Sequence, residues 1–209
     1  MHPSRRSRLT TRQRHVAYAA LATADAVLAA TGHERLRRLT KPALMPLLLP
    51  GRDRRTRTAL LLGGAGDVAL LGSGDAAFLT GLGAFFVGHL AWIDQLRRGA
   101  DPRSLRHGSR AAVAGGYLVA FTGLNAYLWR RTGPHRLAVL GYSTVLLGTA
   151  LAALRSPSPA TAVGGGLFLA SDSLIALEKF AGLTLPAHEA WVMGSYAAAQ
   201  ALLADGGPR

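Results

Sequence analysis

The chain has no cysteine, only two lysines among its 24 basic residues, and few acidic or aromatic residues. The absence of cysteine excludes disulfides, thiol catalysis and thiolate metal sites. No hydrophilic block is long enough to form a separate soluble domain. What the chain does have is apolar sequence: 49% of its 209 residues are hydrophobic and 25 are glycine, spread along nearly its whole length.

The positive charge is sorted along the chain. Lys41 and Lys179 lie at the borders of apolar stretches, and all 22 arginines lie in the short stretches between or beside them. A soluble basic protein scatters both residue types over its surface, so this separation is typical of a chain sorted by a bilayer. We therefore expect the formal charge of +13 to face anionic lipid headgroups, with membrane lipids as partners and no nucleic acid.

Eight apolar segments follow one another. A hydrocarbon core of about 30 Å takes roughly 20 helical residues to cross, with about 17 tolerated. The segments cover residues 15–32, 40–50, 57–72, 76–97, 109–129, 135–154, 159–181 and 186–204. Seven are long enough, whereas the second carries Pro42, Pro46 and Pro50 and is either a short span or a broken, re-entrant piece. The sequence thus predicts an all-α integral membrane bundle of about eight transmembrane helices.

The distribution of arginine favours eight spans over seven, because cytoplasmic loops collect positive charge. If residues 40–50 cross, 16 arginines fall on one side and 6 on the other; if they do not, the division weakens to 14 and 8. We therefore expect a multi-pass protein of the cell membrane with both termini cytoplasmic. Its parts would be a basic tail over residues 1–14, one transmembrane domain over 15–204 and a short tail over 205–209.

Two segments invite other interpretations. The first apolar run follows a basic start, as a secretory signal does, but Asp25 inside it and the many later segments favour an uncleaved helix. The run GGAGDVALLGSGD is rich in glycine like a phosphate-binding loop, but it lacks the Gly-Lys-Ser/Thr ending and a preceding strand. Small residues that let helices approach closely explain it better.

Ionisable side chains inside apolar segments are costly to bury and are therefore the first candidates for chemistry. They are Asp25, Lys41, Asp67, His89, Asp94, Asp172, Glu178 and Lys179. Asp67 is about 8 Å and Asp172 about 13 Å from the outer ends of their predicted helices. Lys41 begins the proline-rich segment from the same side. We expect these three side chains to converge on one pocket in the outer half of the membrane.

Several of these residues also have a purely structural explanation. Asp94 lies beside Arg97 and Arg98, where a salt bridge at the membrane interface would account for it. Asp25 is surrounded by Ala and Thr and suits hydrogen bonding between helices. Glu178, close to a helix end, can reach water.

The same holds for Lys179 and His89. Lys179 follows Asp172 by seven residues on nearly the same helix face, which suits a structural ion pair. His89 suits a hydrogen-bonded core histidine. The chain has no HExxH motif and no clustered histidine pair, so we expect no metal and no cofactor. Ser171 beside Asp172 lacks the GxSxG elbow of a hydrolytic triad.

Five fragments in order carry a resemblance. The run TKPALMPLLL, followed by GGAGDVALL, FLTGLGAFFVGHLAW, GGGLFLASDSLIALEKF and SYAAAQALL, resembles the YhhN family of multipass membrane proteins, the lysoplasmalogenases, over roughly residues 36–203. The resemblance implies an eight-helix membrane fold. It also implies hydrolysis of the vinyl ether bond of a lysophospholipid substrate, the lysoplasmalogen, to a fatty aldehyde and a glycerophospho-base.

The resemblance also implies site residues. The two aspartates implicated in the family's catalysis correspond to Asp67 and Asp172, and Lys41 and His89 match other motif positions. Ser171 belongs to the Ser-Asp motif, and Tyr196 and Gln200 to the C-terminal motif. The chain departs from the family where it has Tyr196 alone in place of a frequent Tyr-Tyr pair, and Ala91 and Trp92 in place of an aromatic run, which leaves the substrate open.

The residues themselves suit this chemistry. A vinyl ether hydrolyses by protonation at carbon, so the site needs one carboxylic acid kept protonated and one carboxylate that stabilises the resulting cation and takes a proton from water. Lys41 and Lys179 would hold one of the pair ionised or engage the lipid phosphate. A small-solute or proton-coupled transporter also uses intramembrane Asp, His and Lys, although the two halves show no persuasive repeat. A structural or lipid-binding protein without catalysis is the third alternative.

Overall fold

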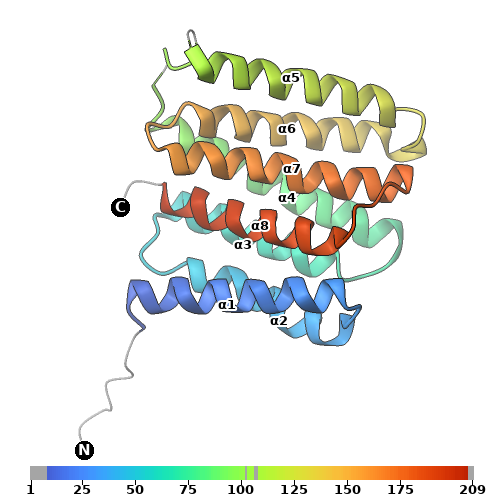
Figure 1. Cartoon of the computed structure of the whole chain (residues 1–209), viewed down its shortest axis with the longest axis horizontal. Helices are drawn as coiled ribbons and strands as arrows, with labels where there is room; N and C mark the ends of the chain where they lie inside the picture. The colour runs from blue at the N-terminus through green and yellow to red at the C-terminus, as the bar shows by residue number, and fades with distance from the viewer. Residues whose placement is uncertain (1–8, 102, 106–107, 207–209) are drawn as a thin grey trace, which may run out of the picture.

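The computed structural model describes residues 9–101, 103–105 and 108–206, which form a bundle of eight α-helices (Figure 1). The helices are α1 (Thr11–Ala30), α2 (Glu34–Leu48), α3 (Arg54–Ala69), α4 (Gly74–Arg97), α5 (Gly108–Leu128), α6 (Arg136–Leu154), α7 (Pro159–Ala181) and α8 (His188–Asp205). A short 3-10 turn over Gly133–His135 precedes α6, and the described residues contain no strand. The predicted all-α class is therefore confirmed.

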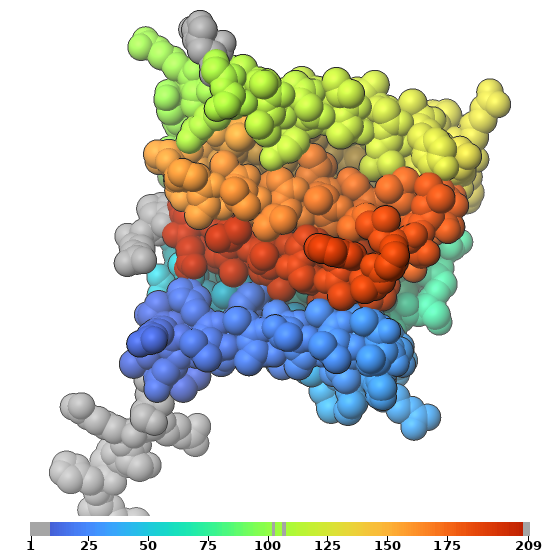
Figure 2. Space-filling view, in the orientation of Figure 1, coloured from blue at the N-terminus to red at the C-terminus, as the bar shows by residue number. Residues whose placement is uncertain are grey.

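Short connections make each helix antiparallel to the next (Figure 1). Seven helices close a ring in the order α1, α2, α3, α4, α6, α7 and α8, and α8 packs back against α1. Helix α5 lies outside this ring against α6 and α7, and forms one edge of the molecule (Figure 2). Of its residues, all of which are described, Leu128 alone is buried. The ring without α5 thus holds the core.

Four helical segments are long and apolar enough to cross a bilayer: Gly74–Arg97, Gly108–Leu128, Gly133–Leu154 and Pro159–Ala181. The other helices are shorter or more polar, and the 15 residues of α2 rise only about 22 Å. The eight antiparallel helices are thus observed, whereas the number that crosses the membrane completely stays a prediction.

Helix α2 differs from the predicted segment 40–50. It begins six residues earlier, at Glu34, and continues without a break through Pro42 and Pro46 to Leu48. Its first turn is polar and is stabilised by a salt bridge of 3.0 Å between Arg37 and Glu34. Because this turn is polar, the apolar pattern of the sequence does not include it in the predicted segment. The broken alternative for this segment is wrong, because the structure has one continuous helix, whereas its full crossing of the membrane stays a prediction.

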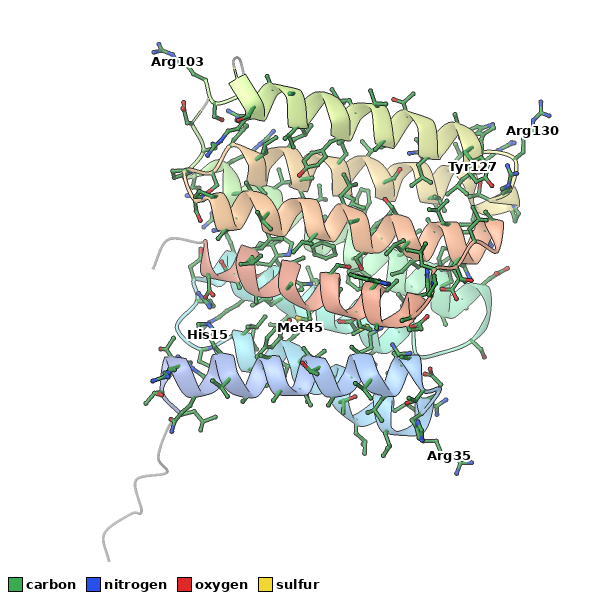
Figure 3. The ribbon with its side chains drawn as sticks, viewed as in Figure 1. His15, Arg35, Met45, Arg103, Tyr127 and Arg130 are labelled. Carbon is green, nitrogen blue, oxygen red and sulfur yellow. The ribbon has the colours of Figure 1, made fainter. Side chains whose placement is uncertain are left out.

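The two ends of the described chain lie at the same end of the bundle (Figure 1). His15 in α1 is 3.3 Å from the Asp205 carboxylate at the end of α8, and Arg52, between α2 and α3, binds the same carboxylate. Arg103 lies at this end, whereas Arg35 and Arg130 lie at the opposite end (Figure 3). These arginines are divided as the eight-segment prediction requires. Which end faces the cytoplasm stays a prediction.

The expected terminal tails are only partly described. Helix α1 already begins at Thr11, so residues 11–14 belong to it and not to a tail. Residues 1–8 of the expected N-terminal tail and 207–209 of the expected C-terminal tail lie outside the described residues.

Glycine allows close packing where the sequence suggested it. A Cβ atom on Gly165 of α7 would lie 2.6 Å from the Ala153 Cβ and 3.1 Å from the Ala150 Cα of α6. In α3, a Cβ on Gly66 would lie 2.5 Å from the ring of Phe85. The glycine-rich run after residue 62 is therefore largely part of a packed helix, which agrees with the packing interpretation.

Candidate functional site

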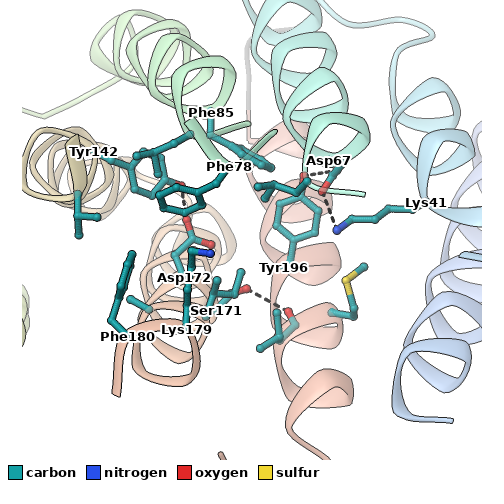
Figure 4. Close-up of a pocket in the computed structure, with 17 residues that line it drawn as sticks. Lys41, Asp67, Phe78, Phe85, Tyr142, Ser171, Asp172, Lys179, Phe180 and Tyr196 are labelled. Carbon is teal, nitrogen blue, oxygen red and sulfur yellow. Dashed lines mark hydrogen bonds and ion pairs between the residues drawn. The ribbon is translucent and has the colours of Figure 1, made fainter. Parts of the chain in front are cut away.

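A cavity of about 100 Å³ lies between the helices of the ring (Figure 4). Its walls are mostly aliphatic and aromatic side chains from α3, α4, α6, α7 and α8, with Lys41 from α2. Its polar side chains are Lys41, Asp67, Tyr142, Ser171, Asp172, Lys179 and Tyr196. The residues expected to converge, Asp67, Asp172 and Lys41, therefore all line this one cavity.

Asp67 is buried and fully engaged. Its side chain is 3% exposed, and the Lys41 Nζ lies 3.4 Å from its Oδ1. The Tyr196 hydroxyl donates a hydrogen bond of 2.6 Å to its Oδ2, and the Gln200 amide donates to that hydroxyl over 3.1 Å. An ammonium group and a hydroxyl donor on the two oxygens stabilise negative charge on this carboxylate.

Asp172 has a different environment. The Tyr142 hydroxyl donates a hydrogen bond to its Oδ2, and its Oδ1 has no hydrogen bond to any residue that the structure describes. No described cation lies within 4.0 Å of this carboxyl group. The two aspartates thus share one cavity but differ in their partners, because only Asp67 is paired with a charge.

A hydrogen-bonded chain continues behind Asp172. The Tyr142 hydroxyl lies 3.2 Å from the His89 Nε2, and the His89 Nδ1 lies 3.0 Å from the Thr149 hydroxyl. Because the Tyr142 hydroxyl gives its hydrogen to Asp172, its oxygen accepts from the Nε2–H of His89. The Thr149 hydroxyl donates to the Val145 carbonyl over 3.1 Å, and so ties the His89 ring to α6. The buried His89 therefore supports Tyr142 from behind.

Lys179 and Ser171 line the cavity with other partners than expected. The Lys179 Nζ lies 4.4 Å from the centre of the Phe78 ring, and no ion pair joins it to Asp172 within 4.0 Å. The expected ion pair is therefore wrong, since seven residues separate the two by about 10.5 Å along the helix. Ser171 donates to the Val192 carbonyl over 3.0 Å and so ties α7 to α8.

The YhhN family model matches residues 36–207. The chain belongs to the YhhN family. It is 35% identical over 194 residues to a protein named lysoplasmalogenase from Mycobacterium tuberculosis (strain CDC 1551 / Oshkosh), which covers 84% of this chain and 72% of that protein. A lysoplasmalogenase of Mycobacterium bovis matches with the same values. Lysoplasmalogenase TMEM86A of Bos taurus is 31% identical over 159 residues, 72% of this chain and 63% of that protein. No solved structure matches the chain.

The part of the chain that matches the YhhN family contains every predicted site residue, from Lys41 to Gln200. Helix α1 lies outside it, although α1 closes the ring between α2 and α8. Within the described residues, no three His, Asp or Glu side chains come together as metal ligands. The polar lining of the cavity thus consists of two carboxyl groups, two amines, two phenols and one serine hydroxyl.

Two predicted residues and one that was missed complete the site. His89 and Gln200 do not line the cavity but contact it through Tyr142 and Tyr196, respectively. Tyr142 was not singled out from the sequence, because the search for costly buried groups considered acids, lysines and histidine. The feature of the sequence that could have indicated Tyr142 is a phenol in the middle of the apolar segment 135–154.

Asp25 and Asp94 lie elsewhere and have structural roles. Asp25 is fully buried and accepts a hydrogen bond from Thr40 of α2, as the helix-to-helix explanation predicted. Asp94 is exposed and binds Arg55, with Arg98 at 3.9 Å. The predicted salt bridge at Asp94 is therefore confirmed for Arg98, and its main partner is Arg55.

Proposed function

We propose that this protein is a lysoplasmalogenase-like membrane hydrolase that cleaves the vinyl ether bond of a lysophospholipid, giving a fatty aldehyde and a glycerophospho-base. The observation that carries the proposal is the pair of aspartates on one apolar cavity, of which one is paired with a cation and the other is not. The names of the mycobacterial and bovine relatives support the same reaction class.

Asp172 is the acid in this proposal. Its Oδ2 is held by Tyr142, and its Oδ1, free of described hydrogen bonds, carries the proton. In an apolar cavity the neutral form of a carboxyl group without a cation partner avoids the loss of hydration that its charged form would suffer. Asp172 gives this proton to the outer carbon of the vinyl ether, and the two electrons of the double bond form the new C–H bond. The inner carbon and the ether oxygen then share the positive charge as an oxocarbenium ion.

Asp67 is the carboxylate. Its ion pair with Lys41 and its hydrogen bond from Tyr196 hold negative charge in the cavity, where it stabilises the oxocarbenium ion. Asp67 takes a proton from the water molecule that attacks the inner carbon, and a hemiacetal forms. The hemiacetal hydroxyl then gives its proton to the Asp172 carboxylate and its oxygen becomes the aldehyde carbonyl, while Asp67 gives its proton to the glycerol oxygen as the bond to the inner carbon breaks. The sum is one vinyl ether and one water to one aldehyde and one alcohol.

The remaining cavity residues suit the ends of such a substrate. Lys179 is exposed at the cavity wall near the end of α7, where its ammonium group can reach a lipid phosphate. The fatty chain would lie along the aliphatic and aromatic wall that includes Leu82, Phe85 and Met193.

The test is aldehyde release by the purified protein in lipid nanodiscs. A lysoplasmalogen and a lysolipid with a saturated ether in place of the vinyl ether are compared. We expect aldehyde from the first alone. Asp172→Asn should abolish it, whereas the matched control Asp94→Asn, which removes an exposed salt bridge far from the cavity, should retain it. Intact substrate after incubation with wild-type protein contradicts the proposal, and solute or proton flux through liposomes in its place would favour the transporter.

A further inference from the structure

The cavity has an aromatic corner around Lys179, near the end of α7 (Figure 4). The Lys179 Nζ lies 4.4 Å from the centre of the Phe78 ring and 5.9 Å from that of Phe180. The two phenylalanine rings meet edge to face with their centres 5.9 Å apart, and the His135 ring packs against Phe78 with centres at 5.6 Å. Phe78 comes from α4 and Phe180 from α7, so the corner is built where two distant parts of the chain meet.

The ammonium group in this corner has aromatic rings and no carboxylate as partners. Within the described residues no carboxylate oxygen lies within 4.0 Å of the Lys179 Nζ. The acidic side chains of the neighbourhood are engaged elsewhere: Glu178 lies 3.3 Å from His188, and Asp75 lies 3.3 Å from His135.

We call the site formed by the rings of Phe78 and Phe180 the cation seat. The faces of aromatic rings attract ammonium groups and recognise quaternary ammonium ligands. Lys179 is exposed and flexible and holds its place through ring contacts alone, which are weak for an exposed side chain. A cation that brings its own counter-charge can therefore replace it. The seat also opens on the same cavity as Asp67 and Asp172.

We propose that the rings of Phe78 and Phe180 bind the cationic nitrogen of the substrate headgroup, and that Lys179 occupies this place in the empty protein. When that nitrogen takes the seat, Lys179 turns to the neighbouring phosphate, so both charges of the headgroup are matched. This inference rests on the proposed function for the lysolipid as ligand but needs no turnover.

The test measures binding of saturated ether lysolipids, which lack the reactive double bond. One carries a phosphocholine headgroup and the other a phosphoglycerol headgroup of the same chain length. Wild-type protein should bind the phosphocholine lipid more tightly. Phe78→Leu should weaken that lipid about 3- to 30-fold, as expected for the loss of a cation–ring contact of about 0.5–2 kcal/mol, and change the phosphoglycerol lipid less than about 2-fold. Phe180→Leu should act in the same direction.

Two control variants distinguish the effect of the aromatic face of Phe78 from that of its size and of a change elsewhere on α4. Phe78→Tyr keeps an aromatic face and should keep the headgroup preference. Phe86→Leu is the same change on the same helix at a residue that does not line the cavity, and should leave both affinities unchanged.

Each outcome bears on a defined claim. Equal wild-type affinities for the two lipids, or an equal loss for both in Phe78→Leu, overturns the cation seat. Headgroup-selective binding without aldehyde release from a lysoplasmalogen leaves the seat standing and removes the proposed reaction. Aldehyde release without headgroup preference removes the seat and leaves the proposed reaction standing. Failure of both lipids to bind, together with no aldehyde release, overturns both claims.

Discussion

Replacing Lys41 by methionine tests whether Asp67 is held as a carboxylate. The ammonium group lies 3.4 Å from Asp67, and the two side chains are 12% and 3% exposed. Removal of one member of a buried ion pair costs about 3–5 kcal/mol. At pH 7 an Asp67 carboxylate left without its cation can instead take up a proton, which costs about 4 kcal/mol. The loss of unfolding free energy therefore stays below about this value. We expect Lys41→Met to lose about 3 kcal/mol of unfolding free energy, which lowers Tm by about 6–12 °C.

A double-mutant cycle isolates the pair. Asp67→Asn removes the charge that Lys41 matches, so the double variant should be more stable than Lys41→Met alone, with a coupling energy of about 2–3 kcal/mol. The assay is unfolding of the protein in mixed micelles, followed by circular dichroism. Lys179→Met is the matched control, since the exposed Lys179 forms no ion pair within the described residues and contacts the Phe78 ring, and it should lose less than about 1 kcal/mol. Additive effects of Lys41→Met and Asp67→Asn, within about 0.5 kcal/mol, would refute a charged Asp67.

Three further predictions concern the two aspartates, Tyr142 and the packing of Gly165. Asp67→Asn and Asp172→Asn should each leave a folded protein whose kcat is at least about 1000-fold lower, because each acts on the reacting atoms; wild-type turnover in either would remove the two-carboxylate mechanism. Tyr142→Phe removes the hydroxyl between His89 and Asp172, and kcat should fall about 10- to 100-fold with a stability loss of about 1 kcal/mol; unchanged kcat would make Tyr142 a wall residue. Gly165→Ala should destabilise the protein by at least about 2 kcal/mol, because its Cβ would meet α6 at 2.6 Å. Gly123→Ala on α5 is the control, since its Cβ would meet no atom within 4 Å. Equal thermal stability of the two variants would contradict the observed packing.

Helix positions were largely predictable because apolar length and charged borders mark them directly. The predicted segment 159–181 is the same as α7, and 76–97 begins two residues after α4 does. The start of α2 was not predictable in this way, because its first turn is polar. The end of α3 also differed: the predicted segment ran to residue 72, whereas the helix ends at Ala69. A short connection follows, and the first residue of α4, Gly74, has φ +85°. Asp67 is therefore two residues from its helix end, closer than expected.

The site was predictable where burial is costly and less so elsewhere. Asp67, Asp172 and Lys41 were found from their charge within apolar sequence, and all three line the cavity. The sequence could not show that Lys179 and Asp172 form no ion pair, because helical spacing indicates a shared face but not the direction of a long side chain. The role of Tyr142 was not predictable from the sequence either, since a phenol in an apolar helix is usually a packing residue.

Aromatic residues of the cation seat show the same limit. Phe78 and Phe180 lie about 100 positions apart in the sequence, and nothing local to either distinguishes it from the other phenylalanines of the bundle. Their common role follows only from the contact of α4 and α7 around the Lys179 ammonium group.

Turnover of a lysoplasmalogen in D₂O tests the central claim most directly, because the proposed acid exchanges its proton with solvent and delivers it to carbon. The released aldehyde, trapped at once and analysed by mass spectrometry, should carry a single deuterium on the carbon next to the carbonyl, and Asp172→Asn should form none of this product. An aldehyde without deuterium at that carbon, or equal cleavage of the saturated ether, would contradict the account.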